Sequence, residues 1–401
     1  MRVEKKVPEI RFDGFSGEWE ENCLGGLIDI RSAARVHKEQ WTEAGVPFFR
    51  TSDVVSFYKG QPNTKAYISH EVYQELSEKI GKVKKGDLLI TGGGSIGIPY
   101  LITNDDPLYF KDADLLWLKN NQKFDGYFLY TFFFSTPFKK HIKSISHIGT
   151  IAHYTIEQAK ATPINTCEEK EQTKIGNTFQ KLDSLIKQQQ QKHDKLSSIK
   201  KAMLEKMFPK QGETIPEIRF KGFSGEWEEK ELGYATDITM GQSPSSENYT
   251  DNPNDYILVQ GNADLKNGFV VPRVWTSEVT KTARKGELIF SVRAPVGEVG
   301  KTNYDVVLGR GVAAINGNEF IYQQLKKLKS DNYWHKVSAG STFDAISSTE
   351  LAMTPIWVAS DLEQNAIGNY FQKLDALINQ HQQQITKLNN IKQACLSKMF
   401  V

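Results

Sequence analysis

The sequence has few cysteines. Its 401 residues include three, Cys23, Cys167 and Cys395, which are widely spaced and form no CxxC or Cys/His cluster. This spacing argues against a disulfide framework and against a structural zinc site. We therefore expect three ordinary buried thiols and no bound metal.

Long apolar runs are also missing. The longest candidate, residues 127–134, is far shorter than the roughly 18 residues that a membrane span requires. Residues 1–8 are charged and contain no apolar core of the signal-peptide kind. We expect a cytoplasmic protein that does not contact a membrane.

Neither sign of charge is in large excess. Lys and Arg number 50 against 48 Asp and Glu, which gives a formal net charge of +2. Many nucleic-acid-binding proteins are clearly basic, so the average charge alone does not suggest DNA. DNA binding would still be compatible with this charge if basic residues gathered on one face, or if a partner subunit neutralised phosphates. The length allows about two or three domains.

The strongest positive feature is an internal duplication. Residues 8–21 (PEIRFDGFSGEWEE) recur as residues 216–229 (PEIRFKGFSGEWEE), with 13 of 14 positions identical. Residues 175–208 recur as residues 367–400, with 22 of 34 positions identical. Such repeats indicate that each half of the chain begins and ends on the same frame.

Between those repeats the two halves diverge. The offset between matched residues falls from 208 to 192, so the second insert is 16 residues shorter than the first. Short islands remain: residues 85–90 (KGDLLI) correspond to 285–290 (KGELIF), and residues 161–164 (ATPI) to 353–356 (MTPI). A repeated frame around two different inserts indicates that the frame meets identical partners while the inserts meet different ones.

The C-terminal part of each repeat predicts a long helix. Apolar residues recur at spacings of three and four, which is typical of a heptad seam. We assign to this seam Ile175, Phe179, Leu182, Ile186, Leu196, Ile199, Ile367, Phe371, Leu374, Ile378, Leu388 and Ile391. Capping boxes are expected from Thr166 to Glu169 and from Ser360 to Glu363.

The order of the chain constrains how these helices pack. The first leads from one insert to the next and the second ends the chain, so we expect an antiparallel pair, each about 40 residues or roughly 60 Å long. The two halves would then be related by a pseudo-two-fold axis. Gln189, His193 and His381 interrupt the seam, and we interpret them as solvated or hydrogen-bonded residues that fix its register.

These features together resemble the specificity subunits of type I restriction-modification enzymes, over essentially the whole chain. The resemblance rests on the duplicated IGN-x-FQKLD helix starts, the GFSGEW segments, and the KGDLLI and GQSPS islands. It implies two variable target-recognition domains that bind a bipartite, asymmetric site on double-stranded DNA. It also implies two methyltransferase (modification) subunits as partners, which would bind S-adenosylmethionine, and two restriction/motor subunits that would use ATP.

The fold class expected is α+β, with two globular target-recognition domains joined by the antiparallel helices as a coiled-coil spacer. The boundaries are residues 1–165 and 216–359 for the recognition domains, 166–208 and 360–401 for the helices, and 209–215 for a linker. Strands are predicted at residues 46–50, 87–91, 256–260 and 287–293. One helix is predicted in each insert, at residues 124–138 and 319–336.

Motifs that would indicate an enzyme fail at required positions. Gly92, Gly94 and Gly97 match a dinucleotide fingerprint, but Pro99 stands where the phosphate-binding helix should begin. Residues 252–255 (NPND) lack the second proline and the aromatic residue of an adenine methyltransferase motif. We therefore expect no cofactor and no catalytic residues on this chain.

Base recognition needs forked donors and acceptors on projecting loops, with hydroxyl groups and backbone amides on phosphates. The candidates in the first insert are Arg31, Arg35, Lys38, Arg50, Ser52, Ser95, His147 and Thr150. Those in the second are Gln242, Ser243, Ser245, Gln260, Asn262, Arg293, Arg310, Ser341 and Thr342. The alternative function is a coiled-coil scaffold whose globular ends bind proteins.

Overall fold

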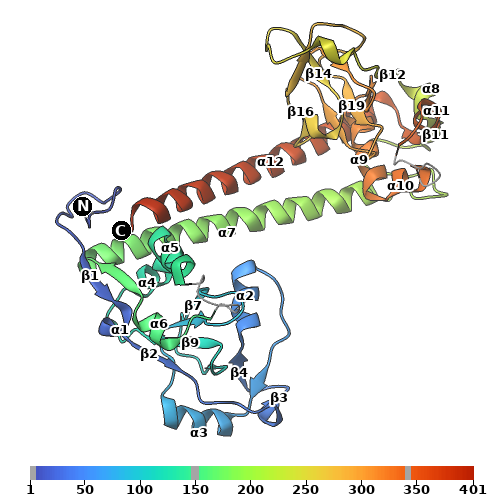
Figure 1. Ribbon diagram of the computed structural model, residues 1–401. Helices are drawn as coiled ribbons and strands as arrows, with labels where there is room; N and C mark the ends of the chain where they lie inside the picture. Colours follow the sequence, from blue (N-terminus) through green and yellow to red (C-terminus); the bar gives the residue numbers. More distant parts are fainter. Residues whose placement is uncertain (1–5, 146–152, 339–344) are drawn as a thin grey trace. The chain divides into compact units, whose positions relative to one another are not determined.

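The computed structural model describes residues 6–145, 153–338 and 345–401. The chain divides into two compact units (Figure 1). Unit 1 comprises Met1–Gln188 and Gln384–Val401, and unit 2 comprises Gln189–Gln383. Among the described residues, no helix is both long and apolar enough to cross a membrane.

Unit 1 is a mixed α and β structure. A four-stranded sheet has the order β2-β9-β6-β7, and a second has the order β3-β5-β4-β8 with β4 and β8 parallel. The elements are β1 (Glu20–Cys23), α1 (Leu24–Leu27), β2 (Asp29–Ser32), η1 (Lys38–Gln40), β3 (Trp41–Thr42), β4 (Val46–Phe49), α2 (Thr51–Lys59), β5 (Tyr67–Ile68), α3 (His70–Ile80), β6 (Leu88–Thr91), β7 (Pro99–Leu101), β8 (Tyr109–Phe110), β9 (Leu115–Lys119), α4 (Gly126–Phe132), α5 (Thr136–Ile145), α6 (Ile156–Lys160), β10 (Pro163–Thr166) and the start of α7 (Glu169–Lys206).

Unit 2 has the same arrangement of two sheets, but each sheet contains more strands. Their orders are β12-β22-β19-β20-β16-β15 and β13-β17-β14-β21-β18. Its elements are β11 (Glu228–Glu231), α8 (Leu232–Ala235), β12 (Ile238–Met240), η2 (Ser246–Asn248), β13 (Tyr249–Thr250), β14 (Tyr256–Val259), η3 (Asn262–Asp264), β15 (Leu265–Lys266), β16 (Phe269–Val270), β17 (Val274–Thr276), β18 (Lys281–Ala283), β19 (Leu288–Ser291), β20 (Val299–Lys301), β21 (Val306–Leu308), β22 (Val312–Ile315), α9 (Glu319–Ser330), α10 (Tyr333–Ser338), α11 (Ser348–Ala352), β23 (Pro355–Val358) and α12 (Asp361–Lys398).

The central sheets of the two units are equivalent. The antiparallel series β2-β9-β6-β7 corresponds strand for strand to β12-β22-β19-β20. The islands that survive in the sequence form this sheet, because KGDLLI and KGELIF lead into β6 and β19, which are buried along their whole length. In each unit a two-stranded antiparallel pair, β1 with β10 or β11 with β23, joins the start of the insert to its end.

Each unit contains one segment from each long helix, and the two segments run in opposite directions. In unit 1 the ring of Phe179 on α7 lies 6.2 Å from that of Phe400, which follows α12. In unit 2 the ring of Phe371 on α12 lies 6.2 Å from that of Phe208, which follows α7. Apolar residues of the helices thereby share one core with the insert of the same unit.

The GFSGEW segments bind both helix ends of their own unit. In unit 1 the N–H of Ile10 donates to the carbonyl of Lys398 at 3.0 Å, and Arg11 pairs with Glu171 near the start of α7. In unit 2 the N–H of Ile218 donates to the carbonyl of Lys206 at 2.9 Å, and Arg219 pairs with Glu363. Each segment therefore holds the end of one helix against the beginning of the other.

The prediction of a single helix in each insert is wrong. Residues 124–138 form α4 and α5, because Asp125 caps α4 through the N–H groups of Tyr127 and Phe128, and Pro137 falls in the first turn of α5. Residues 319–336 form α9 and α10, which separate at Asn332 with its left-handed φ of 58°. The first insert also contains α2 and α3, which the sequence analysis did not predict.

Two other local predictions need correction. Thr166 does not cap a helix; it lies in β10 opposite Glu20, and α7 begins after it. Cys23 is exposed rather than buried, because it is the last residue of β1 in a two-stranded sheet. Cys167 and Cys395 are partly buried. Burial raises the pKa of the Cys167 thiol, which makes it a poor nucleophile.

The predicted seam lies against the core with one exception. Ile175, Phe179, Ile367, Phe371 and Leu374 are buried, and the remaining predicted positions except Ile391 are half-buried. Ile391 is 41% exposed, because the neighbouring Lys392 occupies the inward position and pairs with Asp183 at 2.5 Å. Among the polar interruptions, His381 Nδ1 lies 2.6 Å from Gln189 Oε1, within unit 2.

Candidate nucleic-acid interface

Four loops of unit 2 and the strand β13 meet around one hollow of about 330 Å³, which we call the second hollow. Three of the loops follow β12, β14 and β19, and the fourth precedes β22. The exposed or half-buried polar side chains that line it are Ser243, Tyr249, Gln260, Asn262, Arg293 and Arg310. Five of these six are among the residues that the sequence predicted to contact DNA.

The fold fixes these loops through hydrogen bonds made by the backbone. The N–H of Gly309 donates to the carbonyl of Val259 at 2.8 Å, which continues the parallel pairing of β14 and β21. The N–H of Arg310 donates to Ser243 Oγ at 3.0 Å. The buried carboxylate of Asp264 accepts from the N–H of Gln260 at 2.8 Å. The loops are therefore positioned by the backbone, and their side chains remain available.

The chemistry of the second hollow favours polyanions and base edges. No acidic side chain is among the described residues that line it. Arg293 and Arg310 are exposed, and neither forms an ion pair with a described residue. Gln260 Nε2 donates to Tyr249 Oη at 3.1 Å, which orients the amide and leaves its carbonyl oxygen able to accept. Guanidinium and amide groups of this kind are the side chains that read purines in the major groove.

Unit 1 has a hollow at the equivalent place, which we call the first hollow. Its described lining includes Arg35, His37, Lys38, Trp41 and Lys111. Arg35 and Lys38 are exposed and form no ion pair with a described residue, whereas Lys111 lies 2.5 Å from Asp114. Asp112 and Glu39 also line it, so this hollow is less basic than the second.

Matching backbone contacts show that the two hollows occupy the same position in the fold. The N–H of Lys111 donates to the carbonyl of Phe49 at 2.8 Å, as the N–H of Gly309 does to the carbonyl of Val259. The N–H of Ala113 donates to Ser32 Oγ at 2.9 Å, as Arg310 does to Ser243. One scaffold therefore presents two different sets of side chains.

The other predicted DNA-contacting residues lie outside these hollows. Arg31 pairs with Asp29 at 2.5 Å, and Arg50 pairs with Asp53 at 2.9 Å at the start of α2. The remaining described candidates, Ser52, Ser95, Gln242 and Ser245, are exposed on loops or at the start of α2. His147, Thr150, Ser341 and Thr342 lie outside the described residues.

Sequence reasoning missed Tyr249 in the second hollow and His37, Trp41 and Lys111 in the first. Lys111 follows β8 and lies 73 positions after Lys38, so only the parallel pairing of β4 with β8 places it beside that loop. A signal existed for Trp41, an exposed aromatic residue in a polar stretch, since such residues often contact ligands.

Comparison with known proteins agrees with this architecture. The chain matches the family described as the type I restriction modification DNA specificity domain, twice, over residues 16–198 and 224–390. It is 25% identical over 385 residues to a protein of Methanocaldococcus jannaschii named as the specificity subunit of the type I restriction enzyme MjaX, covering 90% of this chain and 88% of that protein.

Two solved structures share the fold. One is the S subunit of a type I restriction-modification system from M. genitalium, with a TM-score of 0.62, 17% identity, and coverage of 98% of this chain and 99% of that one. The other comes from a type I restriction-modification assembly, with a TM-score of 0.53, 21% identity, and coverage of 94% and 96%. The resemblance inferred from the sequence is thereby confirmed: the chain belongs to the type I restriction-modification DNA specificity family and carries two of its domains.

Proposed function

We propose that this DNA-recognition subunit reads a bipartite, asymmetric target, with one half-site at each hollow. The observation that carries the proposal is the second hollow, where Arg293, Arg310, Gln260 and Asn262 line a surface without a carboxylate among its described residues. Forked donors and amides on fixed loops suit base edges, and the first hollow offers a different set from the same loops. Because the two sets of side chains differ, the two hollows would read different half-sites.

The long helices would act as an antiparallel coiled-coil spacer between the two readers and as a platform for partner subunits. In this proposal the chain has no catalytic activity of its own. Two methyltransferase subunits would bind S-adenosylmethionine and modify adenine, and two restriction/motor subunits would use ATP. A near-neutral chain fits this division of labour, because the partners can supply most of the charge that neutralises phosphate.

Methylation-site sequencing of DNA modified by the chain with its methyltransferase tests the proposal. For Arg293→Ala with Arg310→Ala we expect one half-site to be kept and the other to be lost or relaxed. Losing a bidentate base contact costs about 1–3 kcal/mol of discrimination, or roughly 5- to 150-fold.

Arg284→Ala is the matched control, because Arg284 is exposed at the opposite end of β19 and should leave both half-sites unchanged. The chain alone, given S-adenosylmethionine and DNA, should transfer no methyl group. Wild-type rates and an unaltered two-part site in the double variant would contradict the placement of the reader.

A further inference from the structure

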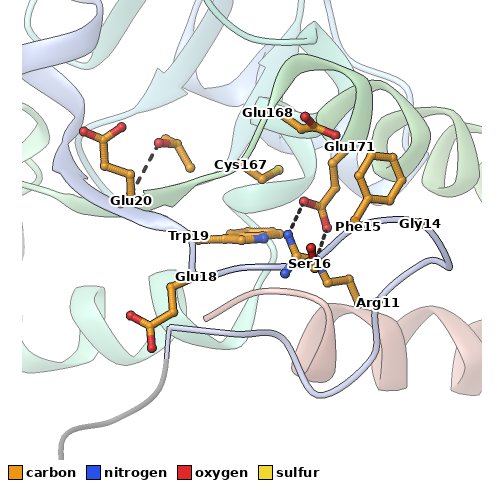
Figure 2. Close-up of a pocket in the computed structure, with 11 residues that line it drawn as sticks. Arg11, Gly14, Phe15, Ser16, Glu18, Trp19, Glu20, Cys167, Glu168 and Glu171 are labelled. Carbon is orange, nitrogen blue, oxygen red and sulfur yellow. Dashed lines mark hydrogen bonds and ion pairs between the residues drawn. The ribbon is translucent and has the colours of Figure 1, made fainter.

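Each unit contains a pocket beside its GFSGEW segment, and these two GFSGEW pockets share their lining. Arg11, Ser16, Glu18, Trp19 and Glu20 line the first pocket, of about 480 Å³ (Figure 2). Their counterparts Arg219, Ser224, Glu226, Trp227 and Glu228 line the second, of about 330 Å³. The pockets lie on the repeated frame, not in the recognition hollows.

A largely buried ion pair, which we call the clasp, contains the arginine that lines each pocket. Arg11 Nε and Nη2 donate to the two carboxylate oxygens of Glu171 at 2.7 and 2.8 Å, and Arg219 does the same to Glu363 at 2.6 and 2.7 Å. These bonds raise the pKa of both arginines above its ordinary value, so both guanidinium groups stay protonated. The clasp explains why the fold needs these four residues in both copies.

Contacts within the chain do not explain why the residues at the rim of the two pockets are the same. Ser16, Glu18, Ser224 and Glu226 are exposed, and none of their side chains bonds to a described residue. Exposed residues without contacts are free to diverge after a duplication, as the recognition domains did. Their identity in both copies indicates that the same external group meets each rim.

A buried donor points to the same external group. Trp19 is 2% exposed, and its indole Nε1–H lacks an acceptor among the described residues although it lines the first pocket (Figure 2). Trp227 Nε1 instead donates to Glu363 at 3.2 Å. A buried donor without an acceptor costs about 1–3 kcal/mol, so an entering carbonyl oxygen would stabilise the first pocket.

The charge of the pockets excludes DNA. The first is lined by Glu18, Glu20, Glu168 and Glu171 against one arginine. In the second, Ser360 replaces Glu168, and Lys230 pairs with Glu228 at 2.8 Å. Both rims still present a free carboxylate, Glu18 or Glu226, which would repel phosphate and attract a lysine or arginine side chain.

We propose that each GFSGEW pocket binds a basic side chain, with its neighbouring main-chain carbonyl, from one copy of the methyltransferase subunit. The more acidic first pocket binds it more tightly than the second. This inference rests on the proposed function, which requires two copies of one partner on one chain. It places that partner on the segment preceding each recognition domain, in addition to any contact with the helices.

The test is a titration of the full chain with the methyltransferase subunit of the same system, followed by calorimetry and native mass spectrometry. Wild type should bind two copies with unequal affinities. Glu18→Lys should weaken the tighter step by about tenfold or more, and Glu226→Lys the looser step, because like charges then face each other. Glu78→Lys, an exposed residue on α3, is the charge-matched control and should change neither step.

Trp19→Phe tests the buried donor. It removes the unpaired N–H and also shrinks a ring that packs on Phe128 and Phe400, so the affinities are compared at a temperature at which calorimetry shows both free chains to be folded. Under that condition the tighter step should weaken by about fivefold. Wild-type affinities in both Trp19→Phe and the Glu18→Lys, Glu226→Lys double variant would overturn the inference. If the wild-type complex still methylated a two-part target, the proposed function would stand; if wild type bound neither methyltransferase nor DNA, both would fall.

Discussion

At the scale of single residues, the helices are held in register by a matched pair of ion pairs. Lys200 contacts both carboxylate oxygens of Asp375 at 2.6 and 2.8 Å in unit 2. Lys392 contacts Asp183 at 2.5 Å in unit 1. Asp183 matches Asp375 in the repeat, and Lys200 matches Lys392, so each repeat supplies the acid to one pair and the base to the other.

The titration of the unit 2 pair has a defined direction. Burial raises the pKa of Asp375, but the charges of Lys200 and Lys326 and hydrogen bonds from Lys200 and Gln323 outweigh it and bring the pKa below the ordinary value. The ionised aspartate therefore stabilises unit 2 at neutral pH. That contribution is lost as the pH falls below 3.8 and through the lowered folded value.

Asp375→Asn should destabilise unit 2 by about 2 kcal/mol at pH 7, because it leaves the largely buried Lys200 without its partner. The gap from wild type should narrow as the pH falls below 3.8. Calorimetric unfolding of both proteins at several pH values measures this. Asp194→Asn on the exposed side of α7 is the control and should cost no more than about 0.5 kcal/mol; an equal loss in both would refute the role of the pair.

At the scale of elements, sequence periodicity was informative where one face of a helix is buried along its length. It placed the long helices at residues 166–208 and 360–401, and they lie at Glu169–Lys206 and Asp361–Lys398. It could not place α2, α3 or the divisions at Phe133 and Asn332, which depend on a cap or on one left-handed residue. Nor could it show that Lys200 and Lys392 point inward, because their partners lie far away in the sequence.

Phe179→Asp with Leu182→Asp should destabilise unit 1, and Phe371→Asp with Leu374→Asp should destabilise unit 2. Phe179 and Phe371 are 0% exposed, and a carboxylate there would be buried without a partner, at a cost of about 4 kcal/mol or more. Calorimetry should show one transition lowered in each variant.

The repeat offers matched controls for both variants. Leu185 and Leu377 occupy corresponding positions and are 44% and 43% exposed, so Leu185→Asp and Leu377→Asp should leave both transitions nearly unchanged. If the buried and exposed substitutions had equal effects, the inward face of the helices would be wrongly assigned.

At the scale of the whole molecule, the duplication predicted the architecture better than any motif predicted the site. Two copies of one frame imply two equivalent units, and both sheets recur in order. The hollows were predicted only in part. Arg293 and Arg310 project from loops and were identified by residue type, whereas Tyr249 and Lys111 reach the hollows through strand pairings that leave no pattern in the sequence.

If the helices form the proposed spacer, four residues inserted into both of them, after Gln190 and after Gln382, should lengthen it by about 6 Å at 1.5 Å per residue. That is close to two base pairs at about 3.4 Å each, and one added helical turn nearly preserves the phase. Methylation-site sequencing should therefore find the same half-sites separated by a longer gap, or lost activity if partner docking fails.

Insertion into α7 alone is the comparison, because it would break the register of the ion pairs and should abolish activity. Full activity of the double insertion at the original spacing would mean that the helices do not set the distance between half-sites.

Unit 1 is built from two separate stretches of the chain, and this affects how it folds during synthesis. Unit 2 is one continuous stretch, but the core of unit 1 includes Leu396, Met399 and Phe400, the last of which contacts Trp19 and Phe128. The core of unit 1 is therefore complete only after residues 396–400 have been synthesised. Removing residues 396–401 should therefore destabilise unit 1 and, under the proposed function, impair the half-site read there, although these residues lie far from its other core residues in the sequence.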